Sequence, residues 1–183
     1  MRLFGTNGIR GVVGRDLTPD LAVRVGRAVA TLWGRALVAV ARDTRSSGPM
    51  VREAVVSGLL ASGARVLDLG VLPSPALQYY VKERGLAGGV IVTASHNPPE
   101  WNGIKVVDAL GMEIARETEE RIEETVAAGT FASPGWRDIG DVATATDGVD
   151  LYMRGIAAKV ERGPVARRRL HVVVDPGNGA ACL

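Results

Sequence analysis

A serine at the start of a proline-stiffened loop is the strongest chemical signal in the sequence. The serine is Ser95, and small, polar and ring-constrained residues surround it in the order Thr93-Ala94-Ser95-His96-Asn97-Pro98-Pro99 and then Asn102-Gly103-Ile104-Lys105. The two adjacent prolines restrict the backbone of this loop, which suits a side chain that must be held in one position for chemistry. The pattern therefore predicts a positioned serine hydroxyl.

The residues near this serine are of types that attract an anion. His96 and Lys105 supply hydrogen-bond donors, and the amide of Asn97 can tie backbone groups of the loop together. Gly103 lets the backbone approach a neighbour closely because it has no side chain. The alternative interpretation treats the serine as an ordinary turn residue, His96 as a surface histidine and Lys105 as a solvated strand residue, and composition alone does not exclude it.

Two other kinds of catalytic site fit the sequence poorly. A serine hydrolase needs its histidine across the site, whereas His96 is the serine's neighbour in sequence and points elsewhere; the chain also lacks the G-x-S-x-G turn of those enzymes. A zinc site fails because two histidines and one cysteine, His96, His171 and Cys182, form no ligand set at these spacings.

Strand-like and helix-like segments alternate along the chain. Apolar runs predict strands, and apolar residues at helical spacing predict helices. The expected strands are 36–41, 65–69, 88–93 and 103–107, and the expected helices are 18–34, 49–60, 74–84, 117–127 and 150–160. Residues 129–148 carry no clear period and are interpreted as a loop or linker.

This alternation predicts a three-layer α/β/α domain with a mostly parallel, mixed sheet covered on both faces. Ser95 follows the expected strand 88–93 directly. The carboxyl ends of strands in open α/β sheets carry the ligand-binding loops, so the serine is expected at such an edge.

The C-terminal part of the chain looks like the beginning of another folding unit. Residues 170–174 are a strong strand signal, and residues 175–179 read as a strand-to-helix turn, after which the sequence stops. A new unit that starts without a covering helix indicates a truncated chain, and a natural short chain with a frayed tail is the alternative. We therefore expect one domain over 1–147, and over 148–183 a linker helix followed by a fragment of a second α/β domain.

Composition narrows the class of protein. A net charge of +2 gives no argument for a nucleic-acid partner, and the longest apolar runs are too short to cross a membrane. A single cysteine allows no disulfide within the chain and fits a reducing compartment, so a cytoplasmic protein is expected. The oligomeric state cannot be read from the sequence.

Four sequence blocks together resemble the α-D-phosphohexomutase superfamily, which includes phosphoglucomutase, phosphomannomutase and phosphoglucosamine mutase. The serine loop 93–105 is similar to the active-site serine loop of that family. The other blocks are Phe4-Gly5-Thr6-Asn7-Gly8-Ile9-Arg10-Gly11, Arg42-Asp43-Thr44-Arg45-Ser46-Ser47-Gly48, and Val172-Val173-Val174-Asp175-Pro176-Gly177-Asn178-Gly179-Ala180. One departure is Ala41, where the family usually has glycine, and it puts only local backbone geometry in question.

The resemblance implies a phosphoserine enzyme. Ser95 would carry a phosphoryl group, give it to a hexose phosphate and recover it from the hexose bisphosphate, moving phosphate between C1 and C6 of the sugar. Arg10 and Lys105 match basic residues near the transferred group and His96 a residue that contacts phosphate or orients the loop. Asn97, Thr93 and Arg42 are expected to bind substrate or phosphate, although Arg42 with its charged neighbours also reads as a structural ion-pair cluster.

The resemblance also implies a magnesium ion and leaves the sugar open. Mg²⁺ would be bound through the phosphate on Ser95, with its protein ligands in a D-G-D-x-D-R loop of the second domain, and this chain contains no such loop. The isolated chain is therefore expected to be inactive. The Gly5-Thr6 opening leans toward phosphoglucosamine mutases, whereas Thr93 and Pro99 are closer to the phosphomannomutase and phosphoglucomutase forms. A non-catalytic phosphate-binding or structural domain of the same fold is the alternative function.

Overall fold

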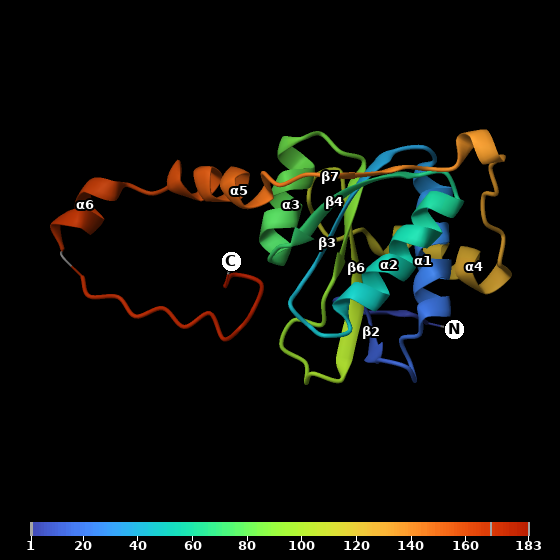
Figure 1. Cartoon of the computed structure of the whole chain (residues 1–183), viewed down its shortest axis with the longest axis horizontal. Helices are drawn as coiled ribbons and strands as arrows, with labels where there is room; N and C mark the ends of the chain where they lie inside the picture. The colour runs from blue at the N-terminus through green and yellow to red at the C-terminus, as the bar shows by residue number, and fades with distance from the viewer. Residues whose placement is uncertain (1, 169, 183) are drawn as a thin grey trace.

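The computed structural model describes residues 2–168 and 170–182, and its core is one mixed sheet between helices (Figure 1). Within the described residues the strands are β1 (Phe4–Gly5), β2 (Gly8–Val12), β3 (Leu37–Arg42), β4 (Arg65–Val71), β5 (Gly88–Val92), β6 (Trp101–Asp108) and β7 (Val142–Thr144). The helices are α1 (Pro19–Trp33), α2 (Gly48–Ala61), α3 (Ser74–Glu83), α4 (Arg116–Ala128), α5 (Gly148–Ala157) and α6 (Arg162–Arg167), with a 3₁₀ turn, η1, at Trp136–Asp138.

The sheet combines a parallel and an antiparallel half. Its strand order is β1-β2-β6-β5-β3-β4-β7. The strands β5, β3, β4 and β7 pair in parallel, whereas β1, β2 and β6 pair antiparallel with their neighbours. The α/β fold and the mixed sheet expected from the sequence are confirmed. The antiparallel half is larger than expected, because β2 pairs with β6 although its glycine-rich sequence gave no strand signal.

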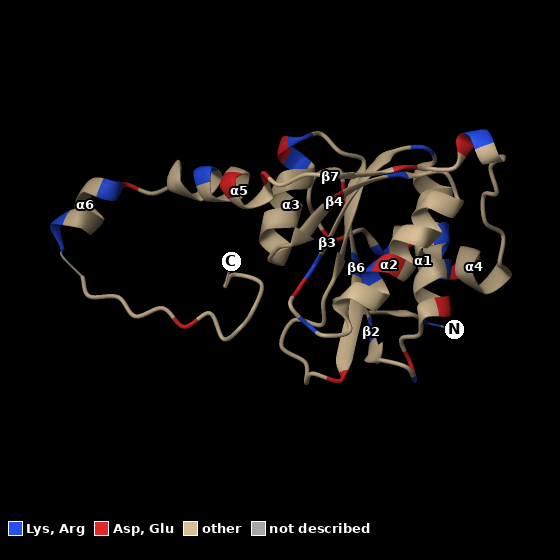
Figure 2. Cartoon of the chain, in the orientation of Figure 1, with Lys and Arg blue, Asp and Glu red and all other residues tan. Residues whose placement is uncertain are grey.

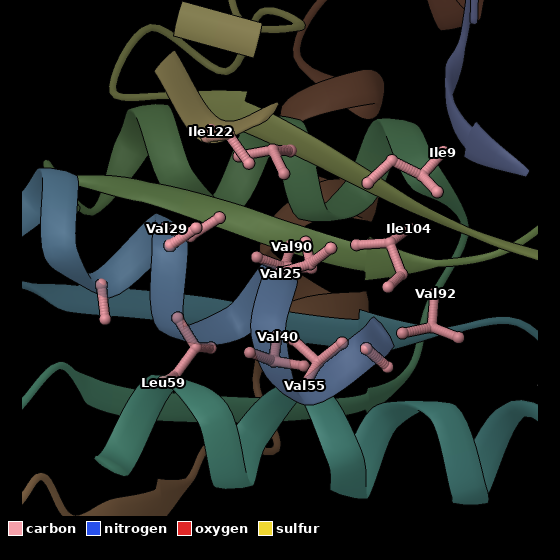
Figure 3. Close-up of a cluster of buried hydrophobic side chains, with 14 of the residues drawn as sticks. Ile9, Val25, Val29, Val40, Val55, Leu59, Val90, Val92, Ile104 and Ile122 are labelled. Atoms are coloured by element: carbon pink, nitrogen blue, oxygen red, sulfur yellow. The ribbon is translucent and has the colours of Figure 1, made fainter. Parts of the chain in front are cut away.

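Alternate residues of each central strand face opposite layers, which explains the fully apolar sequences of these strands. Val40, Val90 and Val92 pack toward α1, α2 and α4, as the close-up of this cluster shows together with side chains from α1 and α2 (Figure 3). Ala41 and Ile91 face the other way, against the layer that contains α3. The sheet is therefore covered on both faces, as the alternation of elements predicts.

Small residues bring α1 and α2 into close contact on the first face. A Cβ atom at Gly26 would collide with the backbone of Val55, and one at Gly58 would collide with the backbone of Val23. The two helices thus meet backbone to backbone at these glycines. The start of α1 follows the sequence signal: Thr18 Oγ1 accepts a hydrogen bond from the Leu21 amide at 3.2 Å, and Pro19 occupies the first turn.

The chain reverses its winding direction between β3 and β5. From β3 it passes through α2 to β4 on one side, and then through α3 to β5 on the other side of β3. Helices α2 and α3 lie on opposite faces of the sheet. Such a switch point leaves a crevice at the carboxyl ends of the two diverging strands, where ligands bind in open α/β sheets.

The segment after β6 differs from the sequence expectation in two places. Residues 129–148, interpreted as a loop, contain η1 and the edge strand β7, which adds to β4 in parallel. The strand expected at 170–174 is wrong: this stretch is exposed and belongs to no strand of the described sheet. Its valines have no sheet here to pair with, so their strand propensity alone does not produce a strand.

Helix α5 packs beside α3, and α6 lies farther along the extended C-terminal segment (Figure 1). The expected bridging helix at 150–160 is observed as α5, slightly earlier in the chain. Nothing tests the boundary proposed at 147, which stays a prediction. No helix in the described part of the chain is both long and apolar enough to cross a membrane.

Glu123 on α4 fastens the N-terminal strand to the body of the domain. Its Oε1 accepts hydrogen bonds from the backbone amides of Leu3 and Phe4, both at 2.8 Å, and its Oε2 faces Arg116. Burial alone would raise the pKa of Glu123, but the two amide bonds and the Arg116 charge outweigh it and hold the pKa below its ordinary value.

A folded-state pKa that is lowered means that this carboxylate stabilises the fold above the ordinary glutamate pKa of about 4.3 and that the stabilisation is lost as pH falls below it. We expect Glu123→Gln to lower the free energy of unfolding by about 1–2 kcal/mol at pH 7, because one charge-assisted acceptor is replaced by a neutral amide. Urea unfolding at pH 7 and pH 3.5 measures this. The difference between wild type and variant should shrink at pH 3.5, and an unchanged difference would contradict the role given to the charge.

Candidate active site

The loops at the carboxyl ends of β3, β4 and β5 enclose a cleft of about 520 Å³ at the switch point. Ser95 lines this cleft, together with residues of the loop after β3 and the first residues of α3. Residues 177–180 of the C-terminal segment border it as well, and the Thr44 hydroxyl donates a hydrogen bond to the Asn178 carbonyl at 2.7 Å. The predicted position of the serine, at the exit of a parallel strand, is confirmed.

Ser95 is exposed and its backbone is held in an unusual conformation. Its φ is +57°, in the left-handed region that residues other than glycine rarely adopt. Such a conformation costs about 1–3 kcal/mol and persists only where the surroundings hold it. The Ser95 amide donates to Thr93 Oγ1 at 3.0 Å, and the Asn97 amide closes a turn onto the Ala94 carbonyl at 3.1 Å.

Arg45 binds the serine loop through its backbone carbonyls. Its guanidinium donates to the carbonyl oxygens of Ser95 at 3.1 Å, Asn97 at 2.6 Å, Pro98 at 2.7 Å and Trp101 at 3.0 Å. The Arg45 side chain is only 13% exposed. These bonds connect the loop after β3 with the loop after β5.

Asp43 completes this connection. Its carboxylate accepts the Arg45 amide at 3.0 Å and Arg45 Nε at 3.2 Å, and it accepts the Thr93 hydroxyl at 2.6 Å. Because an ionised carboxylate only accepts, Thr93 must donate its proton to Asp43. That proton is therefore not free for a phosphate in this arrangement, and Thr93 supports the Ser95 amide instead. In Figure 2 the end of β3 and the loop after it carry basic, acidic and basic residues in turn.

Arg10 reaches the serine loop from the antiparallel half of the sheet. It lies opposite Gly103 in the β2–β6 ladder, and its Nη1 donates to Asn97 Oδ1 at 2.7 Å. A Cβ at Gly103 would approach the carbonyl oxygens of Ile9 and Thr93 to 2.6 and 2.7 Å, so only glycine allows the three strands to meet here. Within the described residues Arg10 Nε is buried without a hydrogen-bond partner.

Lys105 lies on β6, away from the turn 94–98 that holds Ser95. It pairs with Ile91 in the sheet, on the same face as Gly103, and its ammonium group donates to Glu113 Oε1 at 2.8 Å. Its side chain is largely covered. In the described residues no hydrogen bond links Lys105 to the turn 94–98, whereas Arg10 bonds to Asn97 of that turn.

The remaining predicted site residues, His96 and Arg42, lie in different surroundings. His96 is exposed beside the serine, and its ring makes no hydrogen bond to any residue that the structure describes. Arg42 donates to the Asp43 carbonyl at 2.9 Å. The contacts to the serine loop come instead from Arg45, which the sequence analysis interpreted only as part of a structural ion-pair cluster. No local sequence signal marks Arg45, because its contacts depend on the carboxyl end of β3 lying beside that of β5.

The described residues alone do not make a metal site. No group of three or more histidine, cysteine, aspartate or glutamate side chains within 2–168 and 170–182 is arranged to hold a metal ion. Asp43, the carboxylate nearest to the serine loop in the hydrogen-bond network, is already occupied by Arg45 and Thr93. The described residues thus supply no set of protein ligands for the expected magnesium ion.

Comparisons with known proteins agree with the fold. The chain is 41% identical to a phosphoglucomutase/phosphomannomutase of Thermococcus kodakarensis and 41% identical to a phosphoglucosamine/phosphogalactosamine mutase of Sulfurisphaera tokodaii. Both matches cover all of this chain but only 41% and 40% of the relatives, so the chain spans about two fifths of their length. These relatives are phosphohexomutases.

Solved structures and a family comparison give the same result. A phosphoglucomutase/phosphomannomutase family protein of Burkholderia thailandensis superposes with a TM-score of 0.75 at 31% identity, over 87% of this chain and 36% of that one. A structure described as a putative phosphomannomutase, from Thermus thermophilus, gives 0.74 at 33% identity over the same shares. Residues 1–133 match the family described as phosphoglucomutase/phosphomannomutase, alpha/beta/alpha domain I. The chain therefore belongs to the phosphoglucomutase/phosphomannomutase family, and the serine loop at its switch point lies in that family's first domain.

Proposed function

We propose that this chain is the phosphoserine domain of a phosphohexomutase that interconverts hexose 1-phosphate and hexose 6-phosphate through a bisphosphate sugar. The observation that carries the proposal is Ser95: an exposed hydroxyl on a conformationally fixed loop at the switch point of the sheet. The family membership and the phosphohexomutase names of the relatives support the reaction class.

The proposed step is a phosphoryl transfer between two oxygens. The bond from phosphorus to Ser95 Oγ breaks as a bond forms from phosphorus to a sugar hydroxyl oxygen, and the proton of that hydroxyl ends on Ser95 Oγ. The reverse transfer from the other end of the bisphosphate restores the phosphoserine and returns a proton to the sugar oxygen that loses its phosphate. Such transfers depend on positioning and charge neutralisation more than on covalent assistance. Arg45 and Asp43 supply the positioning here, and Arg10 brings a positive charge to the same loop.

The remaining expectations are proposals of the same kind. Arg10, Lys105 and His96 would interact with the transferred phosphate, and a Mg²⁺ bound to the phosphate on Ser95 would neutralise charge with ligands from outside the described residues. Lys105 would have to exchange its bond to Glu113 for one to substrate. Hexose phosphates and hexose bisphosphates are the proposed ligands, and a cytoplasmic location stays a prediction.

The test is isomerisation by the full-length protein that carries this domain. Purified protein with Mg²⁺ and a trace of hexose 1,6-bisphosphate is given the 1-phosphates of glucose, mannose and glucosamine in turn, and formation of the 6-phosphates is followed by phosphorus NMR. Conversion of at least one of them is expected, and it would also identify the sugar. Failure with all of them would leave the alternative, a phosphate-binding or structural domain without turnover.

A further inference from the structure

Arg45 has an unusual set of partners for a residue with no assigned role. Its guanidinium binds four backbone carbonyls, which belong to Ser95, Asn97, Pro98 and Trp101. These span the whole turn that follows β5. An arginine fork can satisfy several acceptors in one plane, whereas an ammonium group has no such rigid geometry.

Asp43 extends the same network to the other side of Ser95. It holds Arg45 through Nε and the Arg45 amide, and it accepts the Thr93 hydroxyl, which in turn accepts the Ser95 amide. The carbonyl of Ser95 is thus fixed by Arg45 and its amide by Thr93. The backbone amide and the carbonyl of Ser95, whose φ is +57°, are therefore both connected to the loop after β3.

This arrangement matches the need of the proposed reaction. A left-handed serine relaxes to an ordinary conformation unless its surroundings prevent it, and that relaxation would turn the hydroxyl away from its position at the cleft. The side chains of Arg45, Asp43 and Thr93 already use their donors and acceptors within the two loops. They are therefore not available to bind substrate. Its effect is on where the serine hydroxyl lies.

We infer that Arg45 is a positioning residue, which with Asp43 and Thr93 holds Ser95 in the backbone conformation required for phosphoryl transfer. The inference rests on the proposed function of Ser95. It adds that the ion pair after β3 acts on catalysis and not only on stability.

The experiment compares Arg45→Ala, Arg45→Lys and Thr93→Val in the full-length protein, with Arg65→Ala as the matched control. Arg65 pairs with Asp141 on the surface at the opposite end of the parallel strands, with 55% of its side chain exposed. Hydrogen exchange of the amides at 94–98 and steady-state kinetics with a hexose 1-phosphate are both measured, after circular dichroism has confirmed the folded state of each variant.

We expect faster exchange at 94–98 and a kcat lowered about 100-fold in Arg45→Ala, with KM changed by less than about threefold, because misplacing a reacting group lowers the rate more than the binding. Arg45→Lys should recover less than about a tenth of the lost rate, since lysine cannot reproduce the fork. Thr93→Val, which keeps the side-chain shape, should shift both readouts in the same direction, and Arg65→Ala should shift neither.

The outcomes separate this inference from the proposed function. If wild type isomerises the sugar phosphate while Arg45→Ala and Thr93→Val keep kcat within about threefold, positioning by Arg45 is wrong and the function stands. If wild type shows no turnover, the proposed function fails, and the exchange of 94–98 still decides the structural part: unchanged exchange in both variants overturns the inference.

Discussion

Replacing Ser95 by alanine is expected to lower the rate of hexose phosphate isomerisation in the full-length protein by about 10³-fold or more, because the variant has no oxygen to carry the phosphoryl group. The fold should be unaffected, since the hydroxyl is exposed and the hydrogen bonds of this residue run through its backbone. Binding of hexose phosphate should therefore persist while turnover is lost. Steady-state kinetics and calorimetric binding measure the two effects separately.

Ser57→Ala provides a matched control for that variant. Ser57 is exposed on α2, away from the cleft residues, and alanine is a favourable residue in a helix. Its activity should equal that of wild type. A Ser95→Ala protein that keeps a tenth or more of the wild-type rate would contradict the assignment of this hydroxyl.

Replacing Arg10 by alanine is expected to lower kcat by about 10²–10³-fold, the effect typical of removing one pre-positioned donor from a developing negative charge. Arg10 contacts the serine loop through Asn97, and its buried Nε has no hydrogen-bond partner among the described residues. A buried donor left unpaired is unfavourable for stability, which favours a role in the reaction over a role in folding. Arg10→Lys should keep the charge but lose the contact geometry, and so should recover only part of the rate.

Arg15→Ala is the control for Arg10. Arg15 lies just after the same strand, with 72% of its side chain exposed beside Asp16. Exposed pairs of this kind contribute little, so this variant should behave as wild type. If Arg10→Ala had the kcat of wild type with a raised KM, the side chain would bind substrate without stabilising the transition state, and its proposed role would be wrong.

The parallel half of the fold could be predicted from the sequence because its elements carry strong local signals. Continuous apolar runs at β3 and β5, a proline and an N-cap threonine at α1, and glycine stops after helices all agree with the structure. The antiparallel strand β2 could not be predicted, since its Gly8 and Gly11 give no propensity. It forms because Ile9 is buried and β6 offers it a partner.

The site could be predicted at its centre and not in its supports. Arg10 reaches the serine loop at Asn97 because that loop follows a strand end and β2 adjoins β6. The contacts of Arg45 depend on which strand neighbours β5, and that neighbour is β3 only because the chain reverses direction after β4. The local sequence does not reveal that pairing, so Arg45 could not be distinguished from the other charged residues of its loop.

The edge strand β7 and the C-terminal segment both show that strand propensity alone does not decide whether a strand forms. At β7, exposed residues 142–144 form a strand because β4 presents a free edge to them. Residues 172–174 have a higher strand propensity but no partner strand among the described residues, and they form no strand and stay exposed. Pairing, not composition, decides both cases.

The most direct test of the account is to locate the phosphate itself. The full-length protein is incubated with hexose 1,6-bisphosphate and Mg²⁺, quenched, digested and sequenced by tandem mass spectrometry. The account predicts a single phosphate on the peptide that contains Ser95, which is absent from Ser95→Ala. A phosphate on another residue, or none on a protein that nevertheless isomerises the sugar, would contradict it.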